Sequence, residues 1–225
     1  MCGRFQLSVK GKQISERYQL SVYDDTFKPS YNCAPSQLLP VILLQNNRQL
    51  HYFKWGLIPF WAKNAAIGNR LINTRAETVE EKPSFRDAFQ HRRCLIPANG
   101  FFEWEKTGTG KPHRFFMKDE SIFSLAGIWE SWKNNQGEVI RTFSILTTRP
   151  NALVQKVHPR MPVILAPNHE QDWLNETKPE KLKKLLLPFD ASKMDAYPLS
   201  KRLNNPAIND PGLVAPETGP LNLFD

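Results

Sequence analysis

The sequence predicts a single α+β domain, built mainly of antiparallel β-strands with helices at the periphery. Its 225 residues suit one domain with a substantial hydrophobic core. Short apolar segments alternate with polar turns along most of the chain, a pattern typical of antiparallel strands. Helical periodicity is confined to a few short segments. We therefore expect one domain over residues 1–214, followed by a C-terminal tail over residues 215–225.

Most of the expected strands are short apolar segments bounded by polar or turn-forming residues. Polar turns at residues 46–48, 108–110 and 134–137 predict that the neighbouring segments pair as hairpins. The last part of the domain, residues 197–214, is irregular, with room for one strand. The strands are expected over Phe5–Val9, Leu39–Leu44, Gln49–Phe53, Arg93–Pro97, Phe101–Glu105, His113–Met117, Ile122–Trp129, Val139–Thr147 and Val163–Leu165.

The expected helices are short and lie between the strands. The first has Ile14, Tyr18 and Leu20 on its buried face, because these residues recur at helical spacing. Loops are expected over residues 24–36 and 64–71, where prolines or polar residues interrupt the apolar pattern. Helices are expected over Lys12–Leu20, Ser84–Gln90, Asn151–Val157, Pro167–Leu174 and Pro179–Leu187, with a short turn after Thr78.

The composition is that of a globular, moderately basic protein. A net charge of +8 and a pI of about 9.4 suit a partner rich in phosphate, although a basic enzyme of another class has the same balance. Three cysteines without close pairing argue against a disulfide framework. No metal-ligand spacing, signal peptide or membrane-spanning segment is present, so we expect no cofactor or metal and a cytoplasmic, DNA-associated location.

The most reactive candidate is Cys2, which becomes the N-terminal residue if Met1 is removed. Its α-amine and thiol then both titrate close to neutral pH, with pKa values of ~8 and ~8.5. The amine can attack an aldehyde to form a Schiff base, and the thiol can close a five-membered thiazolidine ring. Many proteins carry an arbitrary second residue on a frayed terminus, and Cys2 alone does not exclude that interpretation.

Two further residues suit proton transfer. Glu103 lies between aromatic residues on an expected strand, where burial raises the pKa of a carboxyl group. Strand alternation equally allows Glu103 to face solvent. His158 stands in a proline-fixed loop and is a candidate proton shuttle, although a surface-loop histidine is the more common case.

Polar and aromatic residues elsewhere suit a nucleic acid. Asn73 and Arg75 are two positions apart on an extended segment, so an amide and a guanidinium would share one side. Aromatic residues together with arginines are typical of surfaces that bind single strands by stacking and phosphate contacts. The alternative is that these are a turn asparagine, a surface arginine and core aromatic rings. The relevant aromatic and cationic residues are Trp55, Phe60, Trp61, Arg4, Arg75 and Arg160.

The sequence resembles the SOS response-associated peptidase family, whose members crosslink to abasic sites in DNA. Each matching segment is a weak signal alone, but together they follow the family order across most of the chain. The matching segments are Met1–Phe5, Tyr31–Pro35, Trp55–Pro59, Ile72–Thr78, Arg93–Trp104 and His158–Pro162.

The resemblance implies a role for each matched residue. Cys2 would form a thiazolidine with the ring-opened abasic sugar, with Asn73 hydrogen-bonding near it. Glu103 would assist ring opening, and His158 would assist the Schiff-base step. The residues expected to contact DNA are Arg4, Asn32, Pro35, Phe60, Trp61, Arg75, Thr147 and Arg160. The resemblance further implies autocatalytic removal of Met1, a monomer, and single-stranded DNA with abasic sites as the partner.

Two other functions are compatible with the residues. A thiol peptidase acting on other proteins would use Cys2 as nucleophile and His158 as base, without needing a free α-amine. A non-catalytic single-strand-binding module would bind damaged and undamaged DNA alike and form no covalent product. Retention of Met1 blocks the α-amine, so it should abolish crosslinking but not a thiol peptidase. Cys2→Ala should abolish crosslinking but leave the affinity of a pure binding module unchanged.

Overall fold

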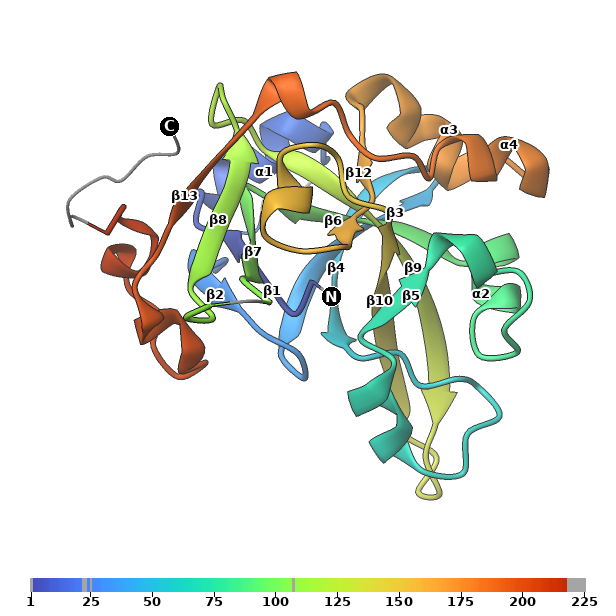
Figure 1. Cartoon of the computed structure of the whole chain (residues 1–225). Helices are drawn as coiled ribbons and strands as arrows, with labels where there is room; N and C mark the ends of the chain where they lie inside the picture. The colour runs from blue at the N-terminus through green and yellow to red at the C-terminus, as the bar shows by residue number, and fades with distance from the viewer. Residues whose placement is uncertain (1, 22–23, 25, 107, 218–225) are drawn as a thin grey trace.

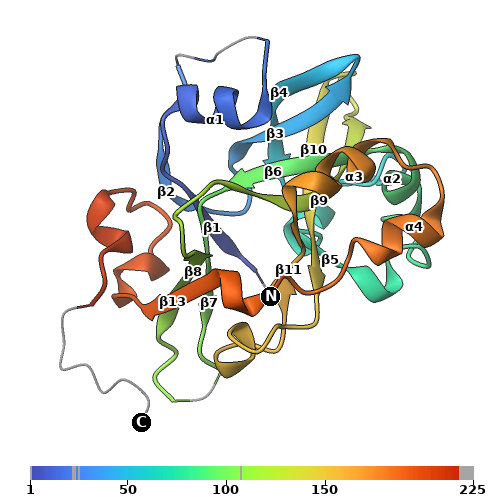
Figure 2. The same ribbon diagram turned by 90° about the horizontal axis from the view of Figure 1, so that it is seen from above.

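The fold consists of two β-sheets with short helices around them, as the two views of the computed structural model show (Figures 1 and 2). The structure describes residues 2–21, 24, 26–106 and 108–217. The strand pairs are antiparallel except for two that involve one long strand. The expected class, a single α+β domain of mainly antiparallel strands, is therefore confirmed.

The smaller sheet has five strands in the order β13-β8-β7-β1-β2. Every pair in it is antiparallel, and β1 lies between β7 and β2. The sheet thus holds the N-terminal strand between two strands that are far apart in the chain. Its strands span Arg4–Leu7 (β1), Ser30–Cys33 (β2), Gly100–Trp104 (β7), Pro112–Met117 (β8) and Met194–Pro198 (β13).

The larger sheet closes on itself into a barrel-like core. Its order is β11-β10-β4-β3-β6-β9-β12, and β10 also pairs with β9, so five strands form a closed ring. The strand β5 lies parallel to β10 outside this ring. The bounds are Leu38–Gln45 (β3), Asn47–Trp55 (β4), Asn73–Arg75 (β5), Arg93–Ala98 (β6), Phe123–Lys133 (β9), Val139–Thr148 (β10), Met161–Pro162 (β11) and Ile164–Leu165 (β12).

Helices lie at the periphery in both views, as expected (Figures 1 and 2). The first helix buries Ile14 and Tyr18, in agreement with its helical spacing. None of the helices in the described ranges is long and apolar enough to span a lipid bilayer. The α-helices are Gly11–Tyr18 (α1), Arg86–His91 (α2), Glu170–Asn175 (α3) and Pro179–Lys184 (α4). The short 3₁₀ helices are Ala65–Arg70 (η1), Ala76–Thr78 (η2), Val154–Lys156 (η3), Pro167–His169 (η4), Ala191–Lys193 (η5), Lys201–Asn204 (η6) and Pro211–Val214 (η7).

Several local expectations were wrong. The segment Asp24–Ser36 is not all loop, because β2 forms within it by pairing with β1. The expected loop over residues 64–71 contains η1, and the expected helix over residues 151–157 is a single 3₁₀ turn. Within residues 197–214, all of them described, strand occurs only at the first two positions, because β13 spans Met194–Pro198 and pairs with β8. The strands β2 and β13 form by pairing with segments distant in the chain, and local sequence patterns do not report such pairing.

Aromatic packing fastens the smaller sheet to the barrel. The ring of Phe5 on β1 lies 5.3 Å from that of Trp55 on β4, and Trp55 stacks at 6.1 Å on Phe143 of β10. All three side chains are buried. Such contacts between large rings add to the stabilisation from burial. The start of β1 is therefore held rigidly against the barrel.

The C-terminal segment, residues 199–214, forms a second small hydrophobic cluster against Phe102 of β7. Glu217, near the end of the described chain, pairs with Lys111 at 2.5 Å. Met1 and most of the expected tail, residues 218–225, lie outside the described residues.

Candidate active site

Sheet pairing brings Cys2 beside Glu103. Strand β1 runs antiparallel to β7 with Arg4 opposite Phe102, so the same register continued by one residue places Gly3 opposite Glu103. Cys2 is fully buried, and its thiol donates to the carbonyl of Arg4 at 3.6 Å. A second residue on a frayed terminus would be exposed, so that interpretation of Cys2 is wrong.

Asn73 holds the backbone of Cys2. It lies on β5, which is fixed by its parallel pairing with β10. Its Nδ2 donates to the carbonyl oxygen of Cys2 at 2.7 Å, while its buried Oδ1 has no hydrogen-bond partner among the described residues. An unpartnered buried acceptor is costly in a folded protein and is typical of functional sites. Asn73 therefore fixes the backbone of Cys2 and keeps an acceptor oxygen beside it.

Glu103 and His158 form a buried acid–base pair. Their exposed fractions are 2% and 6%, and His158 Nδ1 lies 3.6 Å from Glu103 Oε2. The backbone of Arg160 anchors the same imidazole nitrogen, with its N at 3.1 Å and its O at 2.9 Å. The side chains of Glu103 and His158 therefore do not face solvent, which the sequence also allowed. A proton can pass between the two groups after a small approach or through one water molecule.

Burial perturbs the titration of all three groups. Desolvation raises the pKa of Glu103 to about 7, and it lowers the pKa of His158. Desolvation and the nearby charge of Glu103 raise the pKa of the Cys2 thiol far above its usual range. Near neutral pH the site therefore holds a protonated thiol, a neutral imidazole and a carboxyl group that can give or take a proton.

Arg160 lies next to His158, but its guanidinium is paired with a carboxylate. Its guanidinium contacts Glu77 through two hydrogen bonds of 2.5 and 2.9 Å, and it also donates to the carbonyl of Thr147 at 2.6 Å. Thr147 itself is fully buried and donates to the carbonyl of Thr74. Two of the residues expected to contact DNA are thus tied to internal partners. Sequence reasoning missed Glu77, although it lies two residues after Arg75 in a matching segment.

Arg4 and Asn32 are also tied to internal partners. Arg4 Nη1 donates to Asn32 Oδ1 at 2.8 Å and to the carbonyl of Leu203 at 3.0 Å. The amide of Asn32 donates to the carbonyls of Asn205 and Ile208, both at 3.1 Å. These bonds fasten the C-terminal segment beside β1. Arg4 and Asn32 therefore hold the start of β1 in place, two residues after Cys2.

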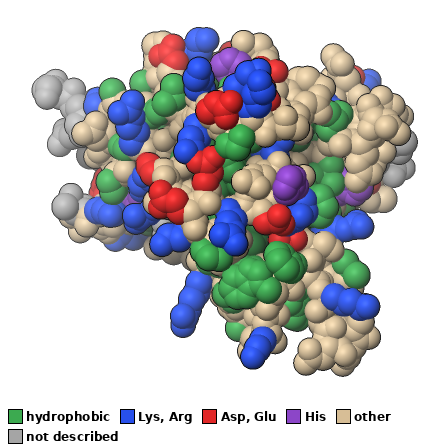
Figure 3. Space-filling model, turned by 90° about the vertical axis from the view of Figure 1, so that its right-hand side faces the viewer, with side chains coloured by type: hydrophobic (Ala, Val, Ile, Leu, Met, Phe, Trp, Pro, Cys, Tyr) green, Lys and Arg blue, Asp and Glu red, His purple; other side chains and the backbone are tan. Residues whose placement is uncertain are grey.

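The remaining residues expected to contact DNA lie at the surface. Arg75 is exposed and forms no ion pair within the described part of the chain, and Pro35 is half-buried. The exposed fractions of Phe60 and Trp61 are 58% and 48%, so neither is a core residue. Trp55, by contrast, is buried. On the face seen in Figure 3, hydrophobic side chains gather low on the molecule with lysine or arginine side chains on either side.

The site holds no evident metal centre. Within residues 2–21, 24, 26–106 and 108–217, no group of three or more His, Cys, Asp or Glu side chains is placed to bind an ion. The chemistry available there is that of a thiol, a backbone held by an amide, a carboxyl group and an imidazole.

Comparison with known proteins identifies the family of this chain. The sequence is 43% identical over 221 residues to the abasic site processing protein YoqW of Bacillus subtilis, covering 95% of this chain and 99% of that one. YoaM of the same species, also named an abasic site processing protein, is 43% identical over 224 residues, covering 96% and 99%. A crystal structure of a Bacteroides thetaiotaomicron protein superposes with a TM-score of 0.86 at 35% identity, covering 96% and 99%. The sequence model of the SOS response associated peptidase family matches residues 1–206, and the chain belongs to that family.

Proposed function

We propose that this protein processes abasic sites in single-stranded DNA by forming a covalent thiazolidine crosslink through Cys2. The observation that carries the proposal is the burial of Cys2 beside Asn73, Glu103 and His158. The names of the relatives, abasic site processing proteins, support abasic sites as the substrate. Removal of Met1, by the protein itself, frees the α-amine that the reaction needs.

The reaction consumes an aldehyde and releases one water molecule. The ring-opened sugar presents C1′ as an aldehyde, and the Cys2 amine attacks this carbon to form a C–N bond. The resulting carbinolamine loses its hydroxyl group as water, with Glu103 supplying the proton. Loss of water leaves an iminium ion that keeps one N–H proton. The thiol sulfur then adds to the iminium carbon, the C=N π electrons return to the nitrogen, and the thiol proton passes to the Glu103 carboxylate, which restores the acid. A five-membered ring containing both nitrogen and sulfur remains.

The electrostatics of the site suit this order of steps. A carboxyl group with a pKa of about 7 is partly protonated at neutral pH, so Glu103 can donate to the leaving hydroxyl group. The imidazole of His158 is neutral, because burial lowers its pKa, and it can accept a proton from the attacking amine. The unpartnered Oδ1 of Asn73 is placed to accept a hydrogen bond from the sugar or the amine.

The same electrostatics weigh against a thiol peptidase. Such an enzyme needs a thiolate at neutral pH, which neighbouring positive charge usually stabilises. Here desolvation and Glu103 both raise the pKa of the Cys2 thiol. A thiol held protonated is a poor nucleophile toward a peptide bond of another protein. Ring closure is intramolecular, because the thiol and the imine carbon belong to the same covalent intermediate, and it therefore tolerates a weaker nucleophile.

The test is denaturing gel electrophoresis after incubation with single-stranded DNA that carries one abasic site. We expect a shifted band that survives heating and is absent with undamaged DNA. Cys2→Ala should remove the band, and so should a variant that retains Met1. The matched control is Cys33→Ala/Cys94→Ala, in which Cys2 is the sole cysteine and the band should persist.

Each outcome separates the candidate functions. Crosslinking that is lost with Cys2 and with a blocked amine supports the proposal. A band that persists in Cys2→Ala would overturn the thiazolidine. If mass spectrometry shows that Met1 has been removed and no shifted band forms, the crosslinking proposal fails and non-covalent binding remains as the candidate function. Cleavage of a protein substrate by a Met1-retaining form would favour the peptidase.

A further inference from the structure

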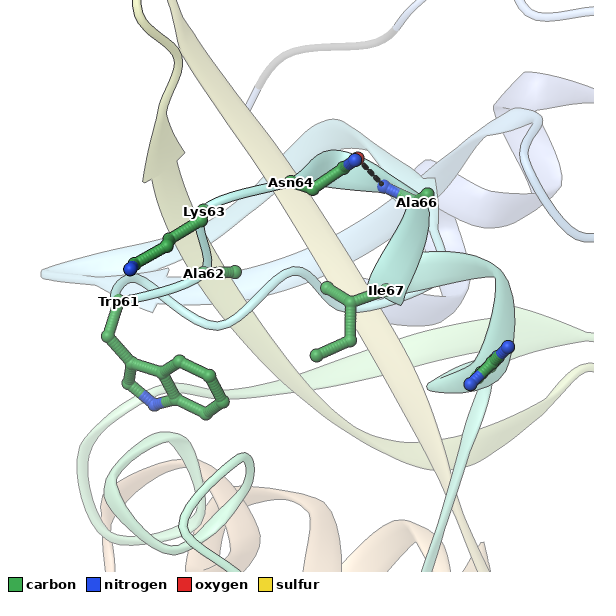
Figure 4. A pocket seen from close by; sticks show the side chains of 7 residues that line it. Trp61, Ala62, Lys63, Asn64, Ala66 and Ile67 are labelled. Carbon is green, nitrogen blue, oxygen red and sulfur yellow. Dashed lines mark hydrogen bonds between the residues drawn. The ribbon is translucent and has the colours of Figure 1, made fainter.

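An abasic site within a single strand has nucleotides on both sides, so a strand that reaches Cys2 leaves it in two directions. In Figures 1 and 2, the start of β1 lies between the smaller sheet on one side and β5 and β10 of the larger sheet on the other. Most residues expected to contact DNA lie on the larger-sheet side, among them Arg75 and the loop with Trp61 that Figure 4 shows. The other arm of the strand therefore passes over the smaller-sheet side.

The expected contacts on the smaller-sheet side offer little free positive charge. Arg4 donates to the carbonyl groups of Leu203 and Asn204. Asn32 also donates to carbonyl groups of the C-terminal segment, and Pro35 carries no charge. A strand phosphate on this side thus has to meet another cation.

Lys106 is an exposed lysine next to the acid–base pair. It follows Glu103 by three residues, so their Cα atoms are at most roughly 11 Å apart. Burial has the largest influence on the pKa values of Glu103 and His158, but the charge of Lys106 also lowers both values. The ammonium group of Lys106 therefore lies close enough to act on both members of the pair.

Lys201 is a second exposed lysine on this side. It begins η6 of the C-terminal segment, and Asn204 at the end of η6 accepts a hydrogen bond from the indole N–H of Trp104 at 2.7 Å. Trp104 ends β7 and precedes Lys106 by two residues. Lys106 and Lys201 therefore flank one contact between β7 and the C-terminal segment.

The positive charges of Lys106 and Lys201 are not neutralised by ion pairs within the described ranges. The acidic side chains of the same segments already have other partners. These contacts join Glu105 to His113 at 3.6 Å, Asp210 to Arg202 at 2.9 Å and Glu217 to Lys111 at 2.5 Å. Free positive charge is thus available beside the site, where a phosphate chain can meet it.

We propose that Lys106 and Lys201 bind phosphates of the single strand on the smaller-sheet side of Cys2. The ligand is the sugar–phosphate backbone, because flexible ammonium groups contact phosphate charge without reading bases. Arg75 and the loop with Trp61 hold the other arm, so the abasic sugar is held between two contact surfaces. This inference rests on the proposed function and names the residues that hold the second arm of the strand.

The first test measures equilibrium binding of an undamaged single-stranded oligonucleotide by fluorescence anisotropy over a range of salt concentrations. Each phosphate contact contributes about 0.7 to the slope of log K against log salt. Lys106→Ala/Lys201→Ala should therefore lower the slope by about 1.4 and weaken binding about 25-fold near 0.1 M salt. Both side chains are exposed, so the substitutions leave the core intact.

The matched control is Lys118→Ala/Lys193→Ala, which removes two exposed lysines from the same sheet. Lys118 follows the far end of β8, and its N–H donates to the carbonyl of Lys193 at 3.0 Å. The length of β8, roughly 20 Å, separates this pair from the loop that carries Lys106. That distance is about twice the Debye length near 0.1 M salt, so the control should change affinity less than about twofold.

A second test separates the two arms of the strand. One abasic oligonucleotide extends only 5′ of the lesion, and the other extends only 3′ of it. With DNA below saturation, Lys106→Ala/Lys201→Ala should slow crosslinking of one oligonucleotide and leave the other within about twofold of wild type. Arg75→Ala should show the opposite preference, because it removes a cation from the other arm.

The outcomes separate this inference from the proposed function. If the Lys106/Lys201 variant binds undamaged DNA like the control, with an unchanged salt slope, the two lysines do not contact the strand. Equal slowing of both end-labelled lesions would contradict the assignment to one arm. The binding result does not depend on crosslinking, because the oligonucleotide is undamaged. Conversely, wild-type protein that fails to crosslink abasic DNA would refute the proposed function while the binding measurements still tested the two lysines.

Discussion

Replacing Glu103 with glutamine should stabilise the protein in a pH-dependent way. Burial raises the pKa of this carboxyl group from 4.5 to about 7 in the folded state. The folded protein then binds more protons than the unfolded chain between these two values, so its stability falls as pH rises through this window. Glutamine has nearly the same shape and does not titrate, and it therefore removes the penalty.

The size of the effect follows from the pKa difference. One pKa unit corresponds to about 1.36 kcal/mol, so a shift from 4.5 to about 7 corresponds to about 3 kcal/mol. Below pH 4.5, the pKa of Glu103 in the unfolded chain, this carboxyl group is protonated in the folded and unfolded states alike. The pKa shift therefore has no effect on stability there. The gain from Glu103→Gln should grow through the window and reach about 3 kcal/mol above it.

Urea denaturation of both proteins from acidic to mildly alkaline pH measures this directly. The difference in unfolding free energy between variant and wild type should rise with pH and then become constant. Other titrating groups affect both proteins and largely cancel in the difference. A difference independent of pH would refute the reasoning, and so would a difference that falls as pH rises, since ionised Glu103 would then stabilise the fold. The accompanying loss of crosslinking rate would separate the functional role of Glu103 from its cost to stability.

Three further substitutions test individual contacts. Glu77→Gln should release Arg160 for phosphate and tighten single-strand binding about fivefold near 0.1 M salt; anisotropy that shows weaker binding would mean that Glu77 instead positions the arginine. Asn32→Ala should lower the unfolding free energy by about 2–3 kcal/mol, because it leaves Arg4 and two backbone carbonyls of the C-terminal segment without their hydrogen bonds to Asn32. A loss below about 1 kcal/mol in urea denaturation would contradict this. Asn73→Ala breaks the bond to the Cys2 carbonyl and should slow single-turnover crosslinking about tenfold or more with DNA affinity little changed; an unaltered rate would remove Asn73 from the mechanism.

Much of the local structure could be predicted from neighbouring residues. The turn at residues 46–48 joins β3 and β4 as a hairpin, and helical spacing placed Ile14 and Tyr18 on the buried face of α1. In both cases residues close in sequence supply the contacts that select the conformation. The ordered motifs beginning at Cys2 likewise identify the family.

The candidate site was less predictable. Sequence alternation left Glu103 equally compatible with core and solvent, and packing between the two sheets decided that it is buried. Arg160 was expected to meet phosphate, yet it pairs with Glu77, which is 83 residues distant in the chain. The titration of each group depends on such neighbours, and no local pattern reports them.

By itself, the sequence determined the strand-rich class, several hairpins and the family, and it named Cys2 as the candidate reactive residue. The tertiary structure alone decided that β10 pairs with β9 and β4 to close the barrel, and that Asn73 holds Cys2 across 71 residues of chain. The physical reason is that backbone preferences act between near neighbours. Burial, pKa shifts and ion pairing instead arise from contacts between segments that only the complete fold brings together.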